Sequence, residues 1–286
     1  VKIALIHRPL SRCVMPTGQP PTPDEPIEKE HLTETVIEAS GLAKAYDSLI
    51  PFGRSVDVLE DASLRVKRGQ IVGVMGENGS GKSTLMNILA GVLEPDAGTV
   101  ERSGRIGWCP QEPRLYERLT VDETFSLFGR GYDMTESEID EAREWLLEVF
   151  DFERFRDRQV RHLSGGNRQK LNLAVALMHE PDLLLLDEPY TGFDWETFLA
   201  FWELADELRE RGVGIAVISH IINEHDRFDV VYELRDGGLN RRSPDNGEHP
   251  ATEAGFTLES VDTPQGSSTT VDSVGTASSQ TRGDRD

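Results

Sequence analysis

A glycine-rich stretch at residues 76–84 reads GENGSGKST and matches the template G-x-x-x-x-G-K-[ST] without a mismatch. A triphosphate is bound by backbone N–H groups that turn inward, and residues without a Cβ let the chain approach it closely. Lys82 adds a positive charge for the β- and γ-phosphates, and Ser83 offers a hydroxyl to Mg²⁺. The alternative is a glycine turn that only packs a helix on a strand. We predict a nucleotide site formed by Gly76, Glu77, Asn78, Gly79, Ser80, Gly81, Lys82, Ser83 and Thr84.

Two adjacent acids, Asp187 and Glu188, follow a run of leucines at residues 183–186. Such an apolar run is typical of a strand buried inside a parallel sheet. Burying neighbouring carboxylates is costly unless a cation compensates, and Mg²⁺ would do so. We therefore predict that Asp187 holds the metal and that Glu188 polarises an attacking water molecule. The alternative is a pair of solvated acids at the end of a strand.

The segments around these residues predict an α/β fold. A short apolar strand at residues 71–75 precedes the glycine loop, and a helix follows it, with Leu85, Ile88 and Leu89 on one face and Gly91 at its end. A later strand at residues 215–219 carries His220 to its carboxyl end, the edge where ligands bind in open α/β sheets. A purely structural histidine is the alternative at this position.

Antiparallel strands are expected before this core, because residues 32–67 contain short alternating segments, with Tyr46 between them. Inside the core, capping boxes begin two helices, one at Thr120 with Glu123 and one at Thr135 with Glu138. These helices predict an α-helical subdomain inserted at about residues 115–170.

A second glycine element at residues 163–170 reads LSGGNRQK and opens another helix, which Ser164 would cap. A serine followed by Gly165 and Gly166 at a helix start can form an anion site. On its own this signal does not distinguish an anion site from ordinary N-cap chemistry.

The composition limits the classes of partner. The net charge is −21, and only 6 of the 30 basic residues are lysine, so we expect no nonspecific binding of nucleic acid. Strong acidity with arginine in place of lysine also suggests the hypothesis of a halophilic-like surface, adapted to high salt. The alternative is an ordinary acidic protein. Cys13 and Cys109 stand in unrelated contexts, which predicts inert thiols rather than a disulfide or a metal site.

No apolar run approaches the length of a membrane-spanning helix, so we expect a cytoplasmic protein. We expect three segments along the chain. Residues 1–31 form a disordered proline-rich leader, residues 32–240 form the ATPase domain, and residues 241–286 form a disordered, acidic tail rich in Ser and Thr.

The order of these elements resembles one family, the ATP-binding subunits of ABC transporters, over about residues 33–240. Residues 76–84 are similar to its Walker A motif, Gln111 to its Q-loop, residues 163–170 to its signature, residues 183–189 to its Walker B motif, residues 191–194 to its D-loop, and Ser219 with His220 to its H-loop. The resemblance implies a P-loop NTPase of the ABC type, with an antiparallel β subdomain and an inserted α-helical subdomain.

The resemblance also implies roles for single residues. Tyr46 would stack on the adenine of ATP, although a core or surface tyrosine is an alternative there because its distance from Gly76 looks long. Gln111 would ligate Mg²⁺ and sense the membrane partner, and His220 would contact the γ-phosphate. Residues 164–166 would act in trans on the ATP held by a second ATPase subunit, so a homodimer is expected. The homodimer would work with a transmembrane permease subunit, at the cytoplasmic face of the cell membrane.

Two departures from the family pattern are Asn167, where glutamine is usual, and the D-loop Thr-Gly-Phe-Asp in place of Ser-Ala-Leu-Asp. The run at residues 169–177 and the D-loop glycine look most like ABC-2 type exporters. The main hypothesis is therefore an ATPase that energises transport, in the direction of export, through a separate permease. The alternatives are a soluble ABC ATPase that remodels a cytosolic assembly without a permease, and a subunit that senses nucleotide without turnover. The sequence does not name the transported molecule.

Overall fold

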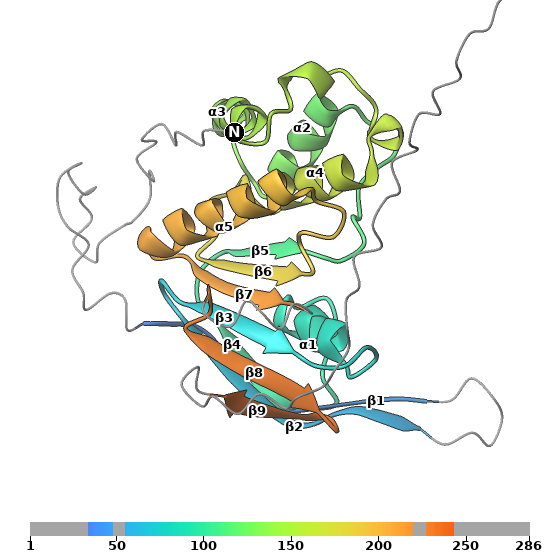
Figure 1. The fold of residues 1–286 in the computed structure, drawn as a ribbon, viewed down its shortest axis with the longest axis vertical. Helices are drawn as coiled ribbons and strands as arrows, with labels where there is room; N and C mark the ends of the chain where they lie inside the picture. Colours follow the sequence, from blue (N-terminus) through green and yellow to red (C-terminus); the bar gives the residue numbers. More distant parts are fainter. Residues whose placement is uncertain (1–33, 48–54, 220–226, 243–286) are drawn as a thin grey trace, which may run out of the picture. The chain divides into compact units, whose positions relative to one another are not determined.

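The strands that carry the predicted chemistry belong to one six-stranded sheet, ordered β5-β6-β7-β3-β8-β9 in this computed structural model (Figure 1). The structure describes residues 34–47, 55–219 and 227–242. The first five strands in this order, β5, β6, β7, β3 and β8, are parallel to one another, and β9 runs antiparallel to β8. They span Ile106–Cys109 (β5), Leu183–Asp187 (β6), Gly214–Ile218 (β7), Ile71–Met75 (β3), Val230–Arg235 (β8) and Gly238–Arg242 (β9).

The strand order brings distant parts of the sequence to one edge of this sheet. Ile218 at the end of β7 pairs with Val74 of β3 on one side and with Asp187 of β6 on the other. Because parallel strands end at the same edge, the glycine loop after β3 and the acids at the end of β6 lie beside each other. The predicted strands at the glycine loop and at the acids are confirmed. His220, which follows β7, lies outside the described residues.

A second, antiparallel sheet has the order β2-β1-β4. Its strands are β1 (Thr35–Tyr46), β2 (Val56–Lys67) and β4 (Ala97–Arg102), so the predicted antiparallel subdomain is confirmed. The strands are longer than the predicted segments, and β4 was not predicted. Five of the six residues of β4 are exposed, and a strand with so little buried surface shows no alternation of apolar and polar residues.

Two apolar cores cover opposite faces of the parallel sheet. Leu184 and Leu186 of β6 face a core with α4 (Gly165–Leu177) and α5 (Trp195–Glu210). Leu183 and Leu185 face a core with α1 (Lys82–Leu89), β1 and β2. Figure 1 shows α5 along one face of the sheet and α1 on the other. The run of four leucines is therefore buried on both faces, as expected for a central parallel strand.

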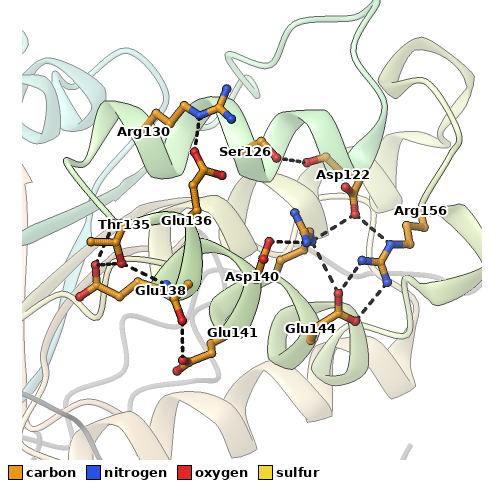
Figure 2. A network of polar contacts seen from close by, with 12 residues as sticks. Asp122, Ser126, Arg130, Thr135, Glu136, Glu138, Asp140, Glu141, Glu144 and Arg156 are labelled. Carbon is orange, nitrogen blue, oxygen red and sulfur yellow. Dashed lines mark hydrogen bonds and ion pairs between the residues drawn. The ribbon is translucent and has the colours of Figure 1, made fainter.

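The predicted helical subdomain consists of α2 (Val121–Gly131), α3 (Glu136–Val149) and the 3-10 turns η2 (Glu153–Phe155) and η3 (Val160–His162). Both capping boxes form as predicted, on Thr120 and Thr135. An arginine then connects the two helices, because Arg156 Nε lies 2.9 Å from Asp122 Oδ1 of α2 while its terminal nitrogens donate to the carboxylate of Glu144 of α3 (Figure 2). The hydrogen bond from Arg156 holds the pKa of Glu144 below its usual range.

The described residues end on a hairpin formed by β8 and β9. Gly237, with φ of +77°, turns the chain back from β8 into β9, which continues to Arg242. This strand therefore spans residue 240, where the sequence predicts the end of the domain. The predicted leader at residues 1–31 and the rest of the predicted tail lie outside the described residues. All described residues belong to one compact unit, Val1–Gly247.

Candidate functional site

Three glycines give the loop between β3 and α1 its shape. Gly76, Gly79 and Gly81 have φ angles of +157°, +80° and +103°. A Cβ on Gly76 would lie 2.6 Å from the carbonyl oxygen of Leu234, and a Cβ on Gly81 would lie 2.7 Å from Cγ1 of Val58. A Cβ on Gly79 would meet no heavy atom within 4 Å. The first and third glycines thus let neighbouring strands approach the loop, whereas Gly79 borders open space.

The side chain of Lys82 folds back across this loop. Its Nζ donates to the carbonyl oxygens of Gly76, at 2.9 Å, and of Glu77, at 2.8 Å. The residue is only 6% exposed. Burial lowers the pKa of Lys82, and the nearby carboxylates of Glu188 and Asp187 oppose this shift. The loop therefore holds a buried ammonium group close to two acids.

A cavity of about 540 Å³ opens beside the loop, which is the size of a site for a small ligand. Ser80, which lies within the same loop, has a buried Oγ without a hydrogen-bond partner among the described residues. The Ser83 hydroxyl, the N-terminus of α1 and the Lys82 ammonium group line this cavity, and these donors fit the phosphates of a nucleotide. The cavity is lined by Val58, Asn78, Gly79, Gly81, Lys82, Ser83, Thr84, Gln111 and Glu188.

Glu188 and Gln111, which also line the cavity, contact each other. Gln111 follows β5 and Glu188 follows β6, and the Nε2 of Gln111 donates to Oε2 of Glu188 at 3.0 Å. Glu188 has a left-handed backbone with φ of +49°, which is rare for a residue with a side chain and costs about 1–3 kcal/mol. Its neighbour Asp187 is only 3% exposed. Strain of this kind is common where a backbone must aim a reactive side chain.

Tyr46 lies near the glycine loop despite its distance along the sequence. It ends β1, and its hydroxyl lies 3.4 Å from Oγ1 of Thr84. Tyr46 as a whole residue is 44% exposed, so part of it is open to a ligand. The antiparallel sheet therefore places Tyr46 beside α1, and its role in binding adenine stays a prediction.

The second glycine element does not reach this cavity within the chain. Ser164 caps α4, because its Oγ accepts from the backbone N of Asn167 at 3.3 Å. A Cβ on Gly166 would lie 2.6 Å from the carbonyl oxygen of Gly192, and a Cβ on Gly165 would meet nothing within 4 Å. Ser164, Gly165 and Gly166 thus form a helix start beside the loop at residues 191–194, and none of them lines the cavity.

One cavity residue was missed by sequence reasoning. Val58 comes from β2 and lies against Gly81. An apolar residue in an alternating strand carries no chemical signature, so only the packing of the two sheets identifies it.

The described residues contain no group of three or more His, Cys, Asp and Glu side chains able to hold a metal. The oxygen set of Ser83, Gln111 and Asp187 that the sequence predicts for Mg²⁺ mixes a hydroxyl, an amide and a carboxylate. Within the same residues, no helix combines the length and the apolar character needed to cross a bilayer.

Sequence comparison finds relatives that are ATP-binding proteins. The family described as ABC transporter matches residues 59–191. The ABC transporter ATP-binding protein NatA of Bacillus subtilis is 36% identical over 182 residues, which cover 59% of this chain and 74% of NatA. The Nod factor export ATP-binding protein I of Ralstonia nicotianae is 34% identical over 205 residues, which cover 68% of this chain and 62% of that protein. The matched part makes up 27% of one relative's own length and 81% of another's.

Structural comparison gives the same fold. The chain superposes with a TM-score of 0.67 on a dimeric ATP-binding cassette in a post-hydrolysis state, bound to ADP and Pi. Sequence identity is 26%, and the superposition covers 73% of this chain and 98% of the cassette. The superposition therefore shows that the described residues have the fold of an ATP-binding cassette.

Proposed function

Because the chain belongs to the family of ABC transporter ATP-binding proteins, we propose that ATP hydrolysis at its glycine loop drives export through a separate transmembrane permease subunit. The name of the Ralstonia relative, an export ATP-binding protein, supports this direction. We place the chain at the cytoplasmic face of the cell membrane, where such a permease would hold it.

The glycine loop binds the triphosphate in this proposal. The α1 helix presents the N–H groups of its first turn, and Lys82 supplies the charge next to the β- and γ-phosphates. Its hydrogen bonds to two loop carbonyls keep the ammonium group in place before ATP arrives. Tyr46, one hydroxyl contact away from Thr84, stacks on the adenine.

We assign Ser83, Gln111 and Asp187 to Mg²⁺, because this ion takes hard oxygen ligands. When bound, Mg²⁺ neutralises charge on the β- and γ-phosphates. Gln111 uses its amide nitrogen on Glu188, so the amide oxygen is the atom we assign to the metal. The near-complete burial of Asp187 suits a carboxylate that a cation compensates.

Glu188 is the group that polarises the attacking water. Its left-handed backbone and the hydrogen bond from Gln111 hold its carboxylate at the cavity that Lys82 also lines. A base that is already oriented needs no rearrangement in the transition state. His220, the predicted contact of the γ-phosphate, lies outside the described residues and keeps that role as a prediction.

A second copy of the chain completes the site. Ser164, Gly165 and Gly166 offer a capped helix start with open space at Gly165, which is suited to a phosphate, and they do not line the chain's own cavity. A homodimer in which each copy brings this helix start to the other's ATP uses both glycine elements. The dimeric cassette to which the chain is similar supports this arrangement.

One observation carries the proposal: the hydrogen bond between Gln111 and Glu188 at the cavity lined by the glycine loop. The test is to purify the chain with a bound membrane protein and to reconstitute both in liposomes. We expect a partner with several apolar segments of about 20 residues and ATP hydrolysis that moves a substrate across the bilayer. A partner that is a water-soluble scaffold, with no integral membrane protein, would instead support the remodelling ATPase.

A further inference from the structure

Two buried polar side chains on α4 face the carboxyl end of β5. Gln169 and Asn172 are 3% and 5% exposed, and they stand one helical turn apart in an otherwise apolar stripe. Burying an amide costs free energy unless it is hydrogen-bonded, so we expect each of these side chains to have a hydrogen-bond partner. Neither side chain lines the nucleotide cavity, and neither has a role in the proposed function.

The contacts of Asn172 are specific. Its Nδ2 donates to the carbonyl oxygen of Pro110 at 2.8 Å and lies 3.2 Å from Sγ of Cys109. Gln169 Nε2 lies 3.8 Å from the same sulfur. Cys109 is fully buried, and burial raises the pKa of its thiol, so it is a neutral neighbour. The amide of Asn172 thus connects α4 to the last carbonyl before Gln111.

The position of that carbonyl affects the residue that follows it. Pro110 has no N–H, so its own backbone can be fixed by hydrogen bonding only through its oxygen. Gln111 follows immediately and donates to Glu188 at 3.0 Å. A change in the position of Pro110 therefore shifts the side chain that orients the proposed base.

The N-cap of α4 is Ser164, the proposed contact to the second copy's ATP, and Asn172 lies about two turns further along the same helix. One rigid helix therefore joins that helix start to the segment that carries Gln111. A shift of α4 on dimerisation reaches Gln111 through Asn172, without a longer chain of contacts.

Building on the proposed function, we infer that Asn172 is a positioning residue, which sets Gln111 against Glu188 and links the helix behind Ser164 to the hydrolytic acid. The competing view is that Asn172 only satisfies a buried carbonyl and contributes to stability. The two views differ in what happens when Gln111 is absent.

The experiment is a double-mutant cycle of Asn172→Leu and Gln111→Ala, with ATP turnover and thermal stability measured for each protein. Leucine removes the donor at similar volume. We expect Asn172→Leu to lower kcat by about three- to tenfold, the equivalent of one hydrogen bond, with little change in KM for ATP. Added to Gln111→Ala, the same change should lower kcat no further.

The matched control is Gln159→Ala, which also removes an amide that donates to a backbone carbonyl, that of Arg118, at 2.9 Å. We expect it to leave kcat unchanged. The inference is overturned if Asn172→Leu leaves kcat unchanged, or if it lowers kcat equally in the presence and absence of Gln111.

A second measurement does not depend on turnover, so it separates this inference from the proposed function. The side-chain amide signal of Gln111 in an NMR spectrum is the one that disappears in Gln111→Ala. We expect this signal to shift in Asn172→Leu and to stay in place in Gln159→Ala. An unshifted signal in Asn172→Leu contradicts the inference even if the protein proves to be an active ATPase.

Discussion

Gly79 and Gly81 separate two effects that an added methyl group has on a glycine loop. Both have left-handed φ angles, of +80° and +103°, which cost an alanine about 1–2 kcal/mol. The Cβ of Gly79→Ala meets no atom within 4 Å, whereas that of Gly81→Ala lies 2.7 Å from Cγ1 and 2.9 Å from the carbonyl oxygen of Val58. Overpacking of this kind costs a further ~1–3 kcal/mol. We therefore expect a loss of about 1–2 kcal/mol for Gly79→Ala and about 2–5 kcal/mol for Gly81→Ala.

The assay is urea unfolding combined with titration of Mg-ATP. Gly79 borders the cavity, and its new Cβ occupies space in which the backbone approaches phosphate. We expect Gly79→Ala to weaken ATP binding by about tenfold or more, equivalent to ~1.4 kcal/mol. Gly131→Ala is the control, because its Cβ also meets nothing within 4 Å but its φ is not left-handed.

Two results would refute this reasoning. Equal losses of stability in Gly79→Ala and Gly81→Ala would show that Val58 does not crowd the loop. Wild-type affinity for ATP in Gly79→Ala would show that this side of the loop does not face the nucleotide.

Two further predictions concern buried basic side chains. Lys82→Ala should weaken ATP binding by roughly ten- to a hundredfold, because a charge-assisted hydrogen bond is lost, and unchanged affinity in calorimetry would remove Lys82 from the site. Burial lowers the pKa of His179 to about 4, so the folded protein binds its proton later than the unfolded chain as the pH falls. Stability should therefore drop by up to about 3 kcal/mol between pH 6.5 and pH 4, and His179→Phe should flatten this dependence. The same change of the urea midpoint with pH in the wild-type protein and in His179→Phe would contradict this prediction.

Local features of the fold were predictable from the sequence. The strand, loop and helix at residues 71–89, both capping boxes, and the Ser164 cap all depend on residues a few positions apart, and the structure contains each of them. The buried strand before Asp187 follows from four leucines in succession.

Contacts that depend on strand order do not follow from local sequence patterns, and only the family resemblance implied them. Gln111 and Glu188 meet because β5 lies next to β6, and Tyr46 reaches Thr84 because β1 pairs with β2 and β4 over the helix α1. The separation of Tyr46 from Gly76 along the chain looked long, and only the path of β2 between them explains it. The link from Asn172 to Pro110 also joins residues that are far apart in sequence.

The central claim is that two copies of the chain close over ATP and that Glu188 then hydrolyses it. Glu188→Gln removes the base and keeps the shape of the side chain, so size-exclusion chromatography with light scattering in Mg-ATP tests the claim directly. We expect the variant to form a stable dimer with ATP retained and no turnover, and we expect Lys82→Ala in the same background to stay monomeric. A Glu188→Gln protein that remains a single chain at saturating Mg-ATP, or that continues to hydrolyse it, would contradict the account.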